Sequence, residues 1–210
     1  MKIRNVNPDR QNRLLAALKS ADFRLISSDL HTVSYSAGDV LFEPTQDVDH
    51  VDFPSKGMIA SLVLSLRDGS SAETAMIGLE GAVGGIVSAG GKPAFTRGIV
   101  QIGGEALRLH TDALESAKQY SATLREHFAR YGDCLLAQTL QSVACNALHD
   151  FDARLARWLL TIHDRVGEDE LHVTQEFIGQ MLGVHRSYPC RRQNSSTFKV
   201  VADALRHHGR

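Results

Sequence analysis

Short alternating runs of apolar and polar residues fill the first half of the chain, and the pattern changes to helical spacing near residue 111. Seven short β-favouring runs lie at 33–35, 40–42, 51–53, 58–64, 74–77, 98–102 and 106–109. Turn residues such as Ala37-Gly38-Asp39 and Ser55-Lys56-Gly57 separate them. Many short strands with frequent turns predict an antiparallel barrel or sandwich. A short amphipathic helix is predicted before them, at Asn12–Ser20.

A long helix is predicted from about Ser121 to His149. A heptad seam runs along it with alternating gaps of four and three, and its main members are Leu124, Phe128, Tyr131, Leu135, Gln138 and Ser142. A second stripe holds Leu136, Leu140, Val143 and Ala147. The helix is either a core helix of one domain or a helix with one face on its own domain and the other on a partner subunit. Its length favours the second interpretation, with the first seam as the dimer interface.

Two further helical patterns follow. Ala153–Arg165 is amphipathic, with Leu155, Trp158, Leu159 and Ile162 on one face. A short strand is predicted at Leu171–Val173, before the segment Thr174–Tyr188. In that segment Thr174 suits a helix cap, an apolar face recurs at helical spacing, and Gly183 stands where the chain turns. The layout is that of a helix-turn-helix, although an ordinary helical hairpin has the same pattern.

Composition supports a folded protein with one basic end. The chain has 210 residues, 43% of them hydrophobic, which is enough for one large or two small domains. The net charge is −1, but residues 186–210 carry six Lys or Arg against Asp203 alone, which gives +5 there and −6 elsewhere. This division fits a binding module attached to a larger sensing or assembly domain. Cys134, Cys145 and Cys190 lie far apart, and with no secretory signal they are expected to be free thiols in the cytoplasm.

The order of these elements, together with three motifs, resembles the Crp/Fnr family of bacterial transcription regulators. The motifs are Ile77–Gly85, Arg154–Leu160 and Leu171–Arg186, and the resemblance extends from about Leu14 to Tyr188. It implies an α+β fold with an antiparallel, cyclic-nucleotide-binding-type jelly-roll barrel (a double-stranded β-helix). The implied domains are the barrel with its N-terminal helix at 1–111, a long dimerisation helix at 112–150 and a winged helix-turn-helix domain at 151–210.

The resemblance also implies partners and DNA-binding residues. Proteins of this family are homodimers that bind pseudo-palindromic double-stranded DNA, with RNA polymerase as a further candidate partner; no membrane is expected. Thr174 and Gln175 would contact backbone phosphates. The side chains at the start of the second motif helix suit phosphates and base edges, and those expected at the DNA are Arg186, Ser187, Tyr188 and Arg191.

An effector site in the barrel would use Glu80, Gly81, Thr96 and Arg97. Cyclic-nucleotide binders of this family have an Arg-Ser or Arg-Thr pair, whereas here Arg97 follows Thr96, so an unidentified effector or none is expected. No cofactor is assigned: the first cysteine is Cys134, so the family's N-terminal iron–sulfur cluster has no ligands, and no histidine pairing indicates haem. No enzyme motif is present, and a metal triad of His31, His50 and Glu43 has no supporting spacing.

The chain departs from the family after Tyr188. Pro189 would cost about 3 kcal/mol inside a helix, the wing has no visible counterpart, and Phe198–His208 is predicted to be a last amphipathic helix. Either the second motif helix starts late, near Ser187, with Pro189 in its first turn, or a reading-frame change or truncation has replaced it. The second explanation is favoured. The alternative function is therefore a small-molecule sensor or dimerisation protein with a truncated or vestigial DNA-binding domain.

Overall fold

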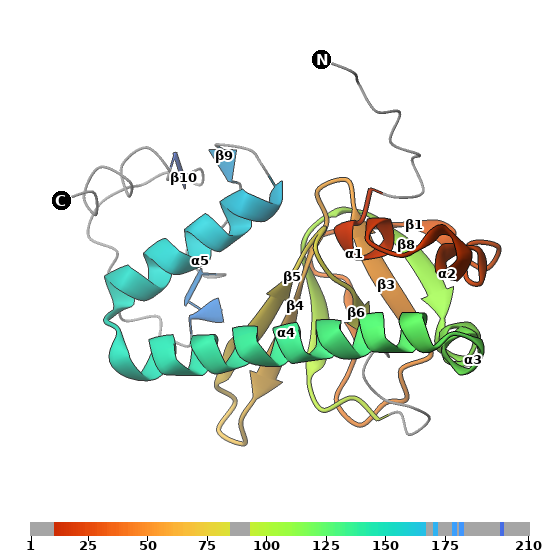
Figure 1. Ribbon diagram of the computed structural model, residues 1–210. Coiled ribbons are helices and arrows are strands. Elements are labelled where there is room, and N and C mark those ends of the chain that lie inside the picture. Colours follow the sequence, from red (N-terminus) through yellow and green to blue (C-terminus); the bar gives the residue numbers. More distant parts are fainter. Residues whose placement is uncertain are drawn as a thin grey trace, which may run out of the picture.

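Two antiparallel sheets and the helices that cover them make up the protein (Figure 1). The computed structural model describes residues 11–84, 93–166, 170–171, 178–179, 181–182 and 198–199. The sheet region comes first in the chain, and a long helix runs past both sheets before the chain turns back into the helix Phe151–Val166. The fold is therefore α+β, with the strand region preceding the helical region as expected.

Each large sheet has four strands, and every pairing within it is antiparallel. The first sheet has the order β1-β8-β3-β6, with β1 at His31–Tyr35, β8 at Gly104–His110, β3 at His50–Ser55 and β6 at Val83–Gly84. The second has the order β2-β7-β4-β5, with β2 at Val40–Phe42, β7 at Arg97–Ile102, β4 at Ile59–Ser65 and β5 at Ser71–Ile77. All seven predicted strands are confirmed; the two-residue β6 is additional.

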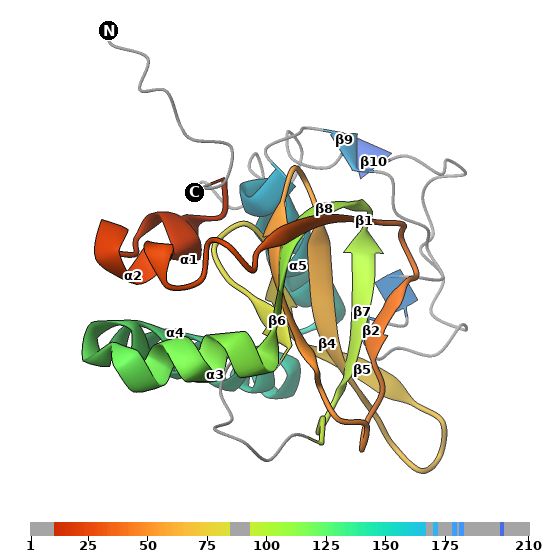
Figure 2. The same ribbon diagram turned by 90° about the vertical axis from the view of Figure 1, so that its right-hand side faces the viewer.

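The outer face of the first sheet carries the first hydrophobic core. Val51 and Phe53 of β3 alternate with inward-facing residues, as the two-residue period of a strand requires. They pack against α1 (Arg13–Ala16), α2 (Ser20–Arg24), α3 (Thr111–Tyr120) and α4 (Ala122–Leu148) (Figure 2). The helix predicted at Asn12–Ser20 is confirmed as the shorter α1, and α2 is an additional helix that begins at Ser20.

Asn12 begins α1 and ties it to the sheet. Its Oδ1 accepts the N–H of Leu15 at 3.1 Å, which caps the helix. Its Nδ2 donates to the carbonyls of Pro54 at 3.0 Å and Gly81 at 2.7 Å. The side chain is fully buried, so each of these bonds replaces one to water.

Helix α4 confirms the predicted long helix but reverses its two faces. Leu124 is fully buried and Phe128 is 2% exposed, both in the first core. The rest of the seam also faces its own domain. Tyr131 packs on the first core, and Leu135 packs on the cluster between the sheets. Gln138 donates to the Met76 carbonyl at 2.8 Å, and Ser142 is buried. The assignment of this seam to the dimer interface is therefore wrong. Apolar positions repeat at heptad spacing on two nearly opposite faces of α4, and the spacing alone does not show which face is buried.

The outer face of the second sheet is covered by the C-terminal helical region. Helix α5 (Phe151–Val166) confirms the amphipathic pattern and buries Trp158, Leu159 and Ile162. These side chains form one apolar cluster with residues from β4, β5 and the described part of the predicted helix-turn-helix, namely Ile59, Val63, Met76, Ile178, Met181 and Leu182. The C-terminal region is therefore packed on the sheet by a shared core.

A small two-stranded sheet pairs a strand before the motif segment with a strand after it. β9 (Glu170–Leu171) pairs antiparallel with β10 (Phe198–Lys199). The strand predicted around Leu171 is confirmed at that residue. The helix predicted from Phe198 is wrong at Phe198 and Lys199, which are extended and paired. Apolar spacing in a short segment does not distinguish a helix from a strand, and here the pairing partner decides.

Replacing Phe128 by alanine tests the orientation of α4. Removing a buried aromatic ring from a packed core should lower the free energy of unfolding by about 3–5 kcal/mol. The matched control is Arg130→Ala on the exposed side of the same helix, which should change it by less than about 0.5 kcal/mol. Urea unfolding followed by circular dichroism measures both. Similar small effects for the two variants would contradict the packing described.

Candidate functional site

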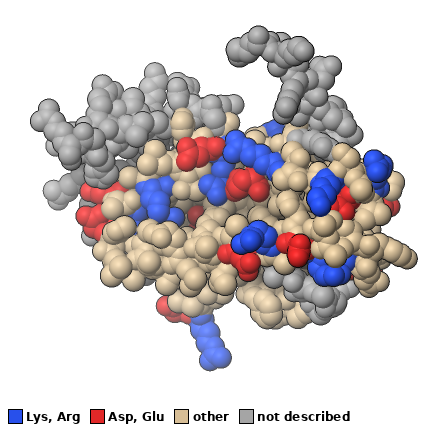
Figure 3. Space-filling model, viewed as in Figure 1, with Lys and Arg blue, Asp and Glu red and all other residues tan. Residues whose placement is uncertain are grey.

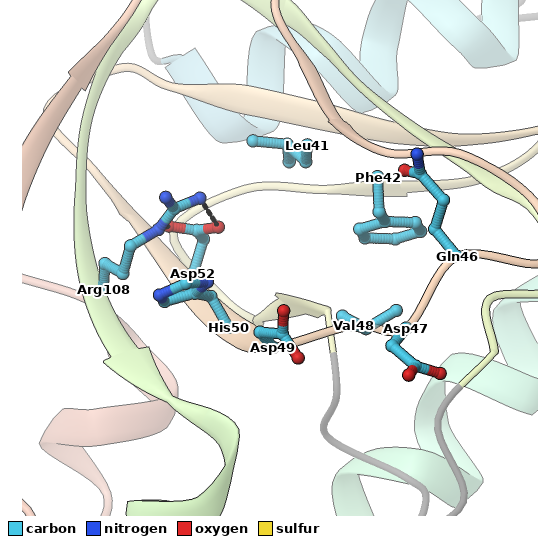
Figure 4. A pocket seen from close by; sticks show the side chains of 9 residues that line it. All are labelled: Leu41, Phe42, Gln46, Asp47, Val48, Asp49, His50, Asp52 and Arg108. Atoms are coloured by element: carbon cyan, nitrogen blue, oxygen red, sulfur yellow. Dashed lines mark hydrogen bonds and ion pairs between the residues drawn. The ribbon is translucent and has the colours of Figure 1, made fainter.

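A polar cavity of about 110 Å³ opens at one end of the space between the sheets. Figure 4 shows its lining, in which the side chains come from β2, β3, β8 and the β2–β3 connection. The described lining residues are Leu41, Phe42, Gln46, Asp47, Val48, Asp49, His50, Asp52 and Arg108. They supply three carboxylates and one guanidinium, so the site is acidic and disfavours a phosphate. Ligand sites for drug-sized molecules usually exceed about 300 Å³, so the cavity as described suits a small ligand.

A buried ion pair forms the wall of this cavity. Asp52 and Arg108 are direct cross-strand partners in β3 and β8. Two bonds of 2.9 Å join Nε to Oδ1 and Nη2 to Oδ2, and the Tyr35 hydroxyl donates to the same Oδ1 at 2.9 Å. The bonds to Asp52 raise the pKa of Arg108, and burial, followed by the charge of Asp52, raises the pKa of Tyr35. Arg108 and Tyr35 therefore keep their protons near neutral pH.

His50 lies at the edge of the cavity, in edge-to-face contact with His110. The ring centroids are 5.3 Å apart. Burial, followed by the charge of Arg108, lowers the pKa of His50, so its imidazole is neutral at pH 7. Within the part of the chain that the structure describes, no group of three His, Cys, Asp or Glu side chains is placed to hold a metal ion. Glu43, one of the three metal ligands considered, lies at Arg97 instead.

Glu80 and Gly81 lie in the connection between β5 and β6, away from the cavity. Glu80 Oε1 accepts the Arg165 Nε–H of α5 at 2.7 Å and the Gly78 N–H at 3.1 Å. At Gly81 an added Cβ would lie 2.4 Å from the Tyr131 hydroxyl, so a larger residue there would displace the Tyr131 side chain. The Glu80 carboxylate thus binds the C-terminal helix, and its role as an effector ligand stays a prediction.

Tyr131 of α4 holds the same connection from the other side. Its hydroxyl donates to the Ala82 carbonyl at 2.9 Å and accepts the Ala82 N–H at 3.0 Å. Burial raises the pKa of this tyrosine, so the hydroxyl keeps its proton.

Thr96 and Arg97 are placed at the start of β7, also outside the cavity lining. Arg97 Nε lies 3.1 Å from Glu43 Oε1, which is ion-pair distance without hydrogen-bond alignment. Three of the four predicted effector residues face different elements and do not form one site: Glu80 faces α5, Gly81 faces α4, and Arg97 faces Glu43. The cavity residues Asp52 and Arg108 were missed. A signal was present, because each interrupts an apolar strand with a charged residue.

The predicted DNA-binding residues Thr174, Gln175, Arg186, Ser187, Tyr188 and Arg191 lie outside the described residues. The described part of the first motif helix agrees with its predicted apolar face. Ile178, Met181 and Leu182 are buried, and the Leu182 N–H donates to the Ile178 carbonyl at 2.9 Å, as in a helix.

An uncharged apolar surface lies along the C-terminal half of α4. Residues 134–148 contain no Lys, Arg, Asp or Glu, and the surface over that half of the helix is correspondingly tan in Figure 3. Leu136, Leu140 and Val143 are 59–60% exposed. With Ala147 they repeat at gaps of four, three and four. We call these four residues the α4 stripe.

Comparison with solved structures gives similar folds at low sequence identity. A protein from Eubacterium rectale described as a transcriptional regulator of the Crp/Fnr family matches with a TM-score of 0.67 and 16% identity, over 93% of this chain and 85% of that one. The c-di-GMP-responsive global regulator CLP of Xanthomonas campestris matches with a TM-score of 0.65 and 12% identity, over 90% and 91%. A CRP-family regulator from Thermus thermophilus matches with a TM-score of 0.65 and 14% identity, over 85% and 97%.

The chain has the fold of Crp/Fnr transcription regulators. No model of a known protein family matches the sequence, and no curated protein matches it. The likeness to the Crp/Fnr fold therefore rests on the comparison of structures. Among the described residues, no helix is both long and apolar enough to cross a membrane.

Replacing Asp52 by alanine tests the ion pair in the cavity wall. It would leave Arg108 partly buried without its carboxylate, and we expect a loss of about 3 kcal/mol in the free energy of unfolding. Tyr35→Phe removes only one bond to the same carboxylate and should cost about 1 kcal/mol. Urea titration measures both. Equal losses of unfolding free energy in the two variants would show that the Asp52 carboxylate does not hold Arg108 and Tyr35 together.

Proposed function

We propose that this protein is a DNA-binding transcription regulator of Crp/Fnr type. It acts as a homodimer on a pseudo-palindromic site and responds to a small effector in the cavity between the sheets. In this proposal residues 1–111 form the effector-type domain, whose two sheets do not close into a barrel in the described residues, residues 112–150 the dimerisation helix region and residues 151–210 the DNA-binding region. The fold supports this proposal, and the observation that carries it is the α4 stripe.

The α4 stripe fits a second copy of the same chain. Its spacing is that of a coiled-coil seam, and a two-fold axis would place each stripe against its equivalent. The opposite face of α4 is already occupied by its own domain. Pairing through the stripe would hold two α5 helices, and the motif segments that follow them, at a fixed separation.

The proposed DNA contacts remain those predicted from the motif. Thr174 and Gln175 bind phosphates, while Arg186, Ser187, Tyr188 and Arg191 approach the groove. An arginine that bonds guanine O6 and N7 together reads sequence. RNA polymerase is a further proposed partner, as in a regulator that acts at promoters, and no catalytic activity is proposed.

The effector is proposed to be a small molecule other than a cyclic nucleotide. The described lining has more carboxylates than cations, and its Arg108 is already paired with Asp52. A phosphate would need a free cation, and the predicted candidate Arg97 lies elsewhere, at Glu43.

One observation favours a second function. Pro189 falls where the second motif helix should continue, and proline is poorly tolerated inside a helix. The alternative is a small-molecule sensor or dimerisation protein whose DNA-binding region is vestigial. DNA selection experiments separate the two functions.

Selection of duplexes from a random pool, followed by fluorescence anisotropy, tests DNA binding. The regulator should select a palindrome with half-sites about one helical turn apart. Arg186→Ala should weaken binding to it by about 1–3 kcal/mol and relax sequence preference. Lys199→Ala is the control for a residue that would contact only phosphate, and it should weaken binding to selected and random duplexes equally. Enrichment of no sequence, with only salt-sensitive binding to random duplex, would support the vestigial alternative.

Replacing Leu140 by glutamate tests the dimer. A charge in the middle of an apolar seam should convert the protein to a monomer, because both copies would bury it unpaired. Tyr120→Glu is the matched control, since Tyr120 is 84% exposed at the end of α3 and lies off the α4 stripe. Light scattering coupled to gel filtration gives the mass of each. A monomeric wild-type protein, or a dimer that persists in Leu140→Glu, would refute this interface.

A further inference from the structure

A carboxylate between the second sheet and α5 has partners on both. Glu73 of β5 accepts the Ser61 hydroxyl of β4 at 2.7 Å and the Trp158 indole N–H of α5 at 3.4 Å. The Gln101 amide of β7 donates to the same oxygen. Burial raises the pKa of Glu73 although the three donors lower it. A polar group placed in an apolar layer must be bonded, so its position fixes that of its partners.

The contacts of Glu73 extend to the predicted DNA-binding motif. The Gln101 Nε2 that donates to Glu73 also lies 3.2 Å from the sulfur of Met181. Met181 is 3% exposed and belongs to the same apolar cluster as Trp158. One carboxylate thus connects the sheet, α5 and the first motif helix.

A second polar attachment lies at the C-terminal end of α5. Arg165 Nε donates to Glu80 at 2.7 Å, and its Nη2 donates to the Met76 carbonyl at 3.2 Å. The aliphatic stem of Arg165 packs closely on Gly78, where an added Cβ would be 3.0 Å from it. Trp158 and Arg165 are seven residues apart, which is about 10 Å along a helix. Two such points fix both the position and the rotation of α5 on the sheet.

The apolar cluster alone would not fix this orientation. Hydrophobic contact is non-directional, whereas hydrogen bonds and ion pairs require alignment. The chain is also extended between α4 and α5, where His149 has φ −103° and ψ 148°. A rotation at this joint would move α5 relative to the α4 stripe.

We propose that Glu73 and Glu80 form a two-point lock that sets the orientation of the DNA-binding region. They are positioning residues, acting through Trp158 and Arg165. The inference rests on the proposed function, because a dimer that reads two half-sites about 34 Å apart needs both reading elements held at a set angle. Without the lock each element would still bind one half-site but would tolerate other spacings.

The test uses the full-length dimer and two variants. Glu73→Ala removes the first point. Arg165→Met removes the second while it keeps an aliphatic stem against Gly78, and it serves if Glu73→Ala does not fold. Lys56→Met is the control, because it breaks an exposed ion pair to Glu105 on another surface.

The first measurement is binding to duplexes whose half-site spacing is changed by one or two base pairs. The wild type should prefer one spacing sharply, and each variant should reduce that preference by about tenfold, because simultaneous engagement no longer depends on one geometry. Loss of folded protein would lower binding to all duplexes by the same factor and leave the ratio unchanged. Variants that bind the preferred duplex as tightly as the wild type and keep its ratio would overturn the lock.

The second measurement does not depend on DNA. Trp158 is the only tryptophan in the chain, so its fluorescence reports on the surroundings of this one side chain. Both variants should shift its emission to the red and increase quenching by acrylamide, and the control should not. If the wild type binds no DNA, the proposed function fails. Changed quenching would then keep the lock as a docking contact without a DNA role, and unchanged quenching would overturn it.

Discussion

The buried face of α4 determines how the rest of the protein can be used. Leu124 and Phe128 close the first core, and Tyr131 and Gln138 bond backbone groups of the sheet region. Once this face is committed to its own domain, the α4 stripe has to point outward. An uncharged seam at heptad spacing is costly to leave in water. The same packing that folds one chain therefore creates the surface that a second copy would cover.

The C-terminal region is attached to the second sheet by a different kind of contact. Most of the contact area is apolar, from Ile59, Val63 and Met76 to Trp158 and Ile162. The carboxylate of Glu73 lies within this apolar contact, and the ion pair between Glu80 and Arg165 lies at its edge. Buried polar groups add little net stability. In this fold they restrict the number of ways in which α5 can lie on the sheet.

The strands and long helices could be predicted because their signals are local. Alternation and turn residues predicted all seven principal strands, and helical spacing predicted α4 and α5. Such local patterns cannot predict contacts between residues that are far apart in the sequence. Asp52 and Arg108 are 56 positions apart, and only strand pairing makes them partners. The two faces of α4 were reversed because a period shows that faces exist without showing which is buried. Glu80 was interpreted from a family motif, and its partner Arg165 lies 85 positions away.

The connection between β5 and β6 unites the contacts on which regulation would depend. Its Gly81 carbonyl accepts Asn12 before α1, its Ala82 backbone bonds Tyr131 of α4, and its Glu80 bonds Arg165 of α5. Coupling between distant sites needs an element whose arrangement both sites affect. A ligand between the sheets that displaced this connection by a fraction of an ångström would disturb all three contacts, because bonds of this length tolerate little movement. Helix α4 and the C-terminal region would then respond together, although neither contributes a residue to the described lining of the cavity.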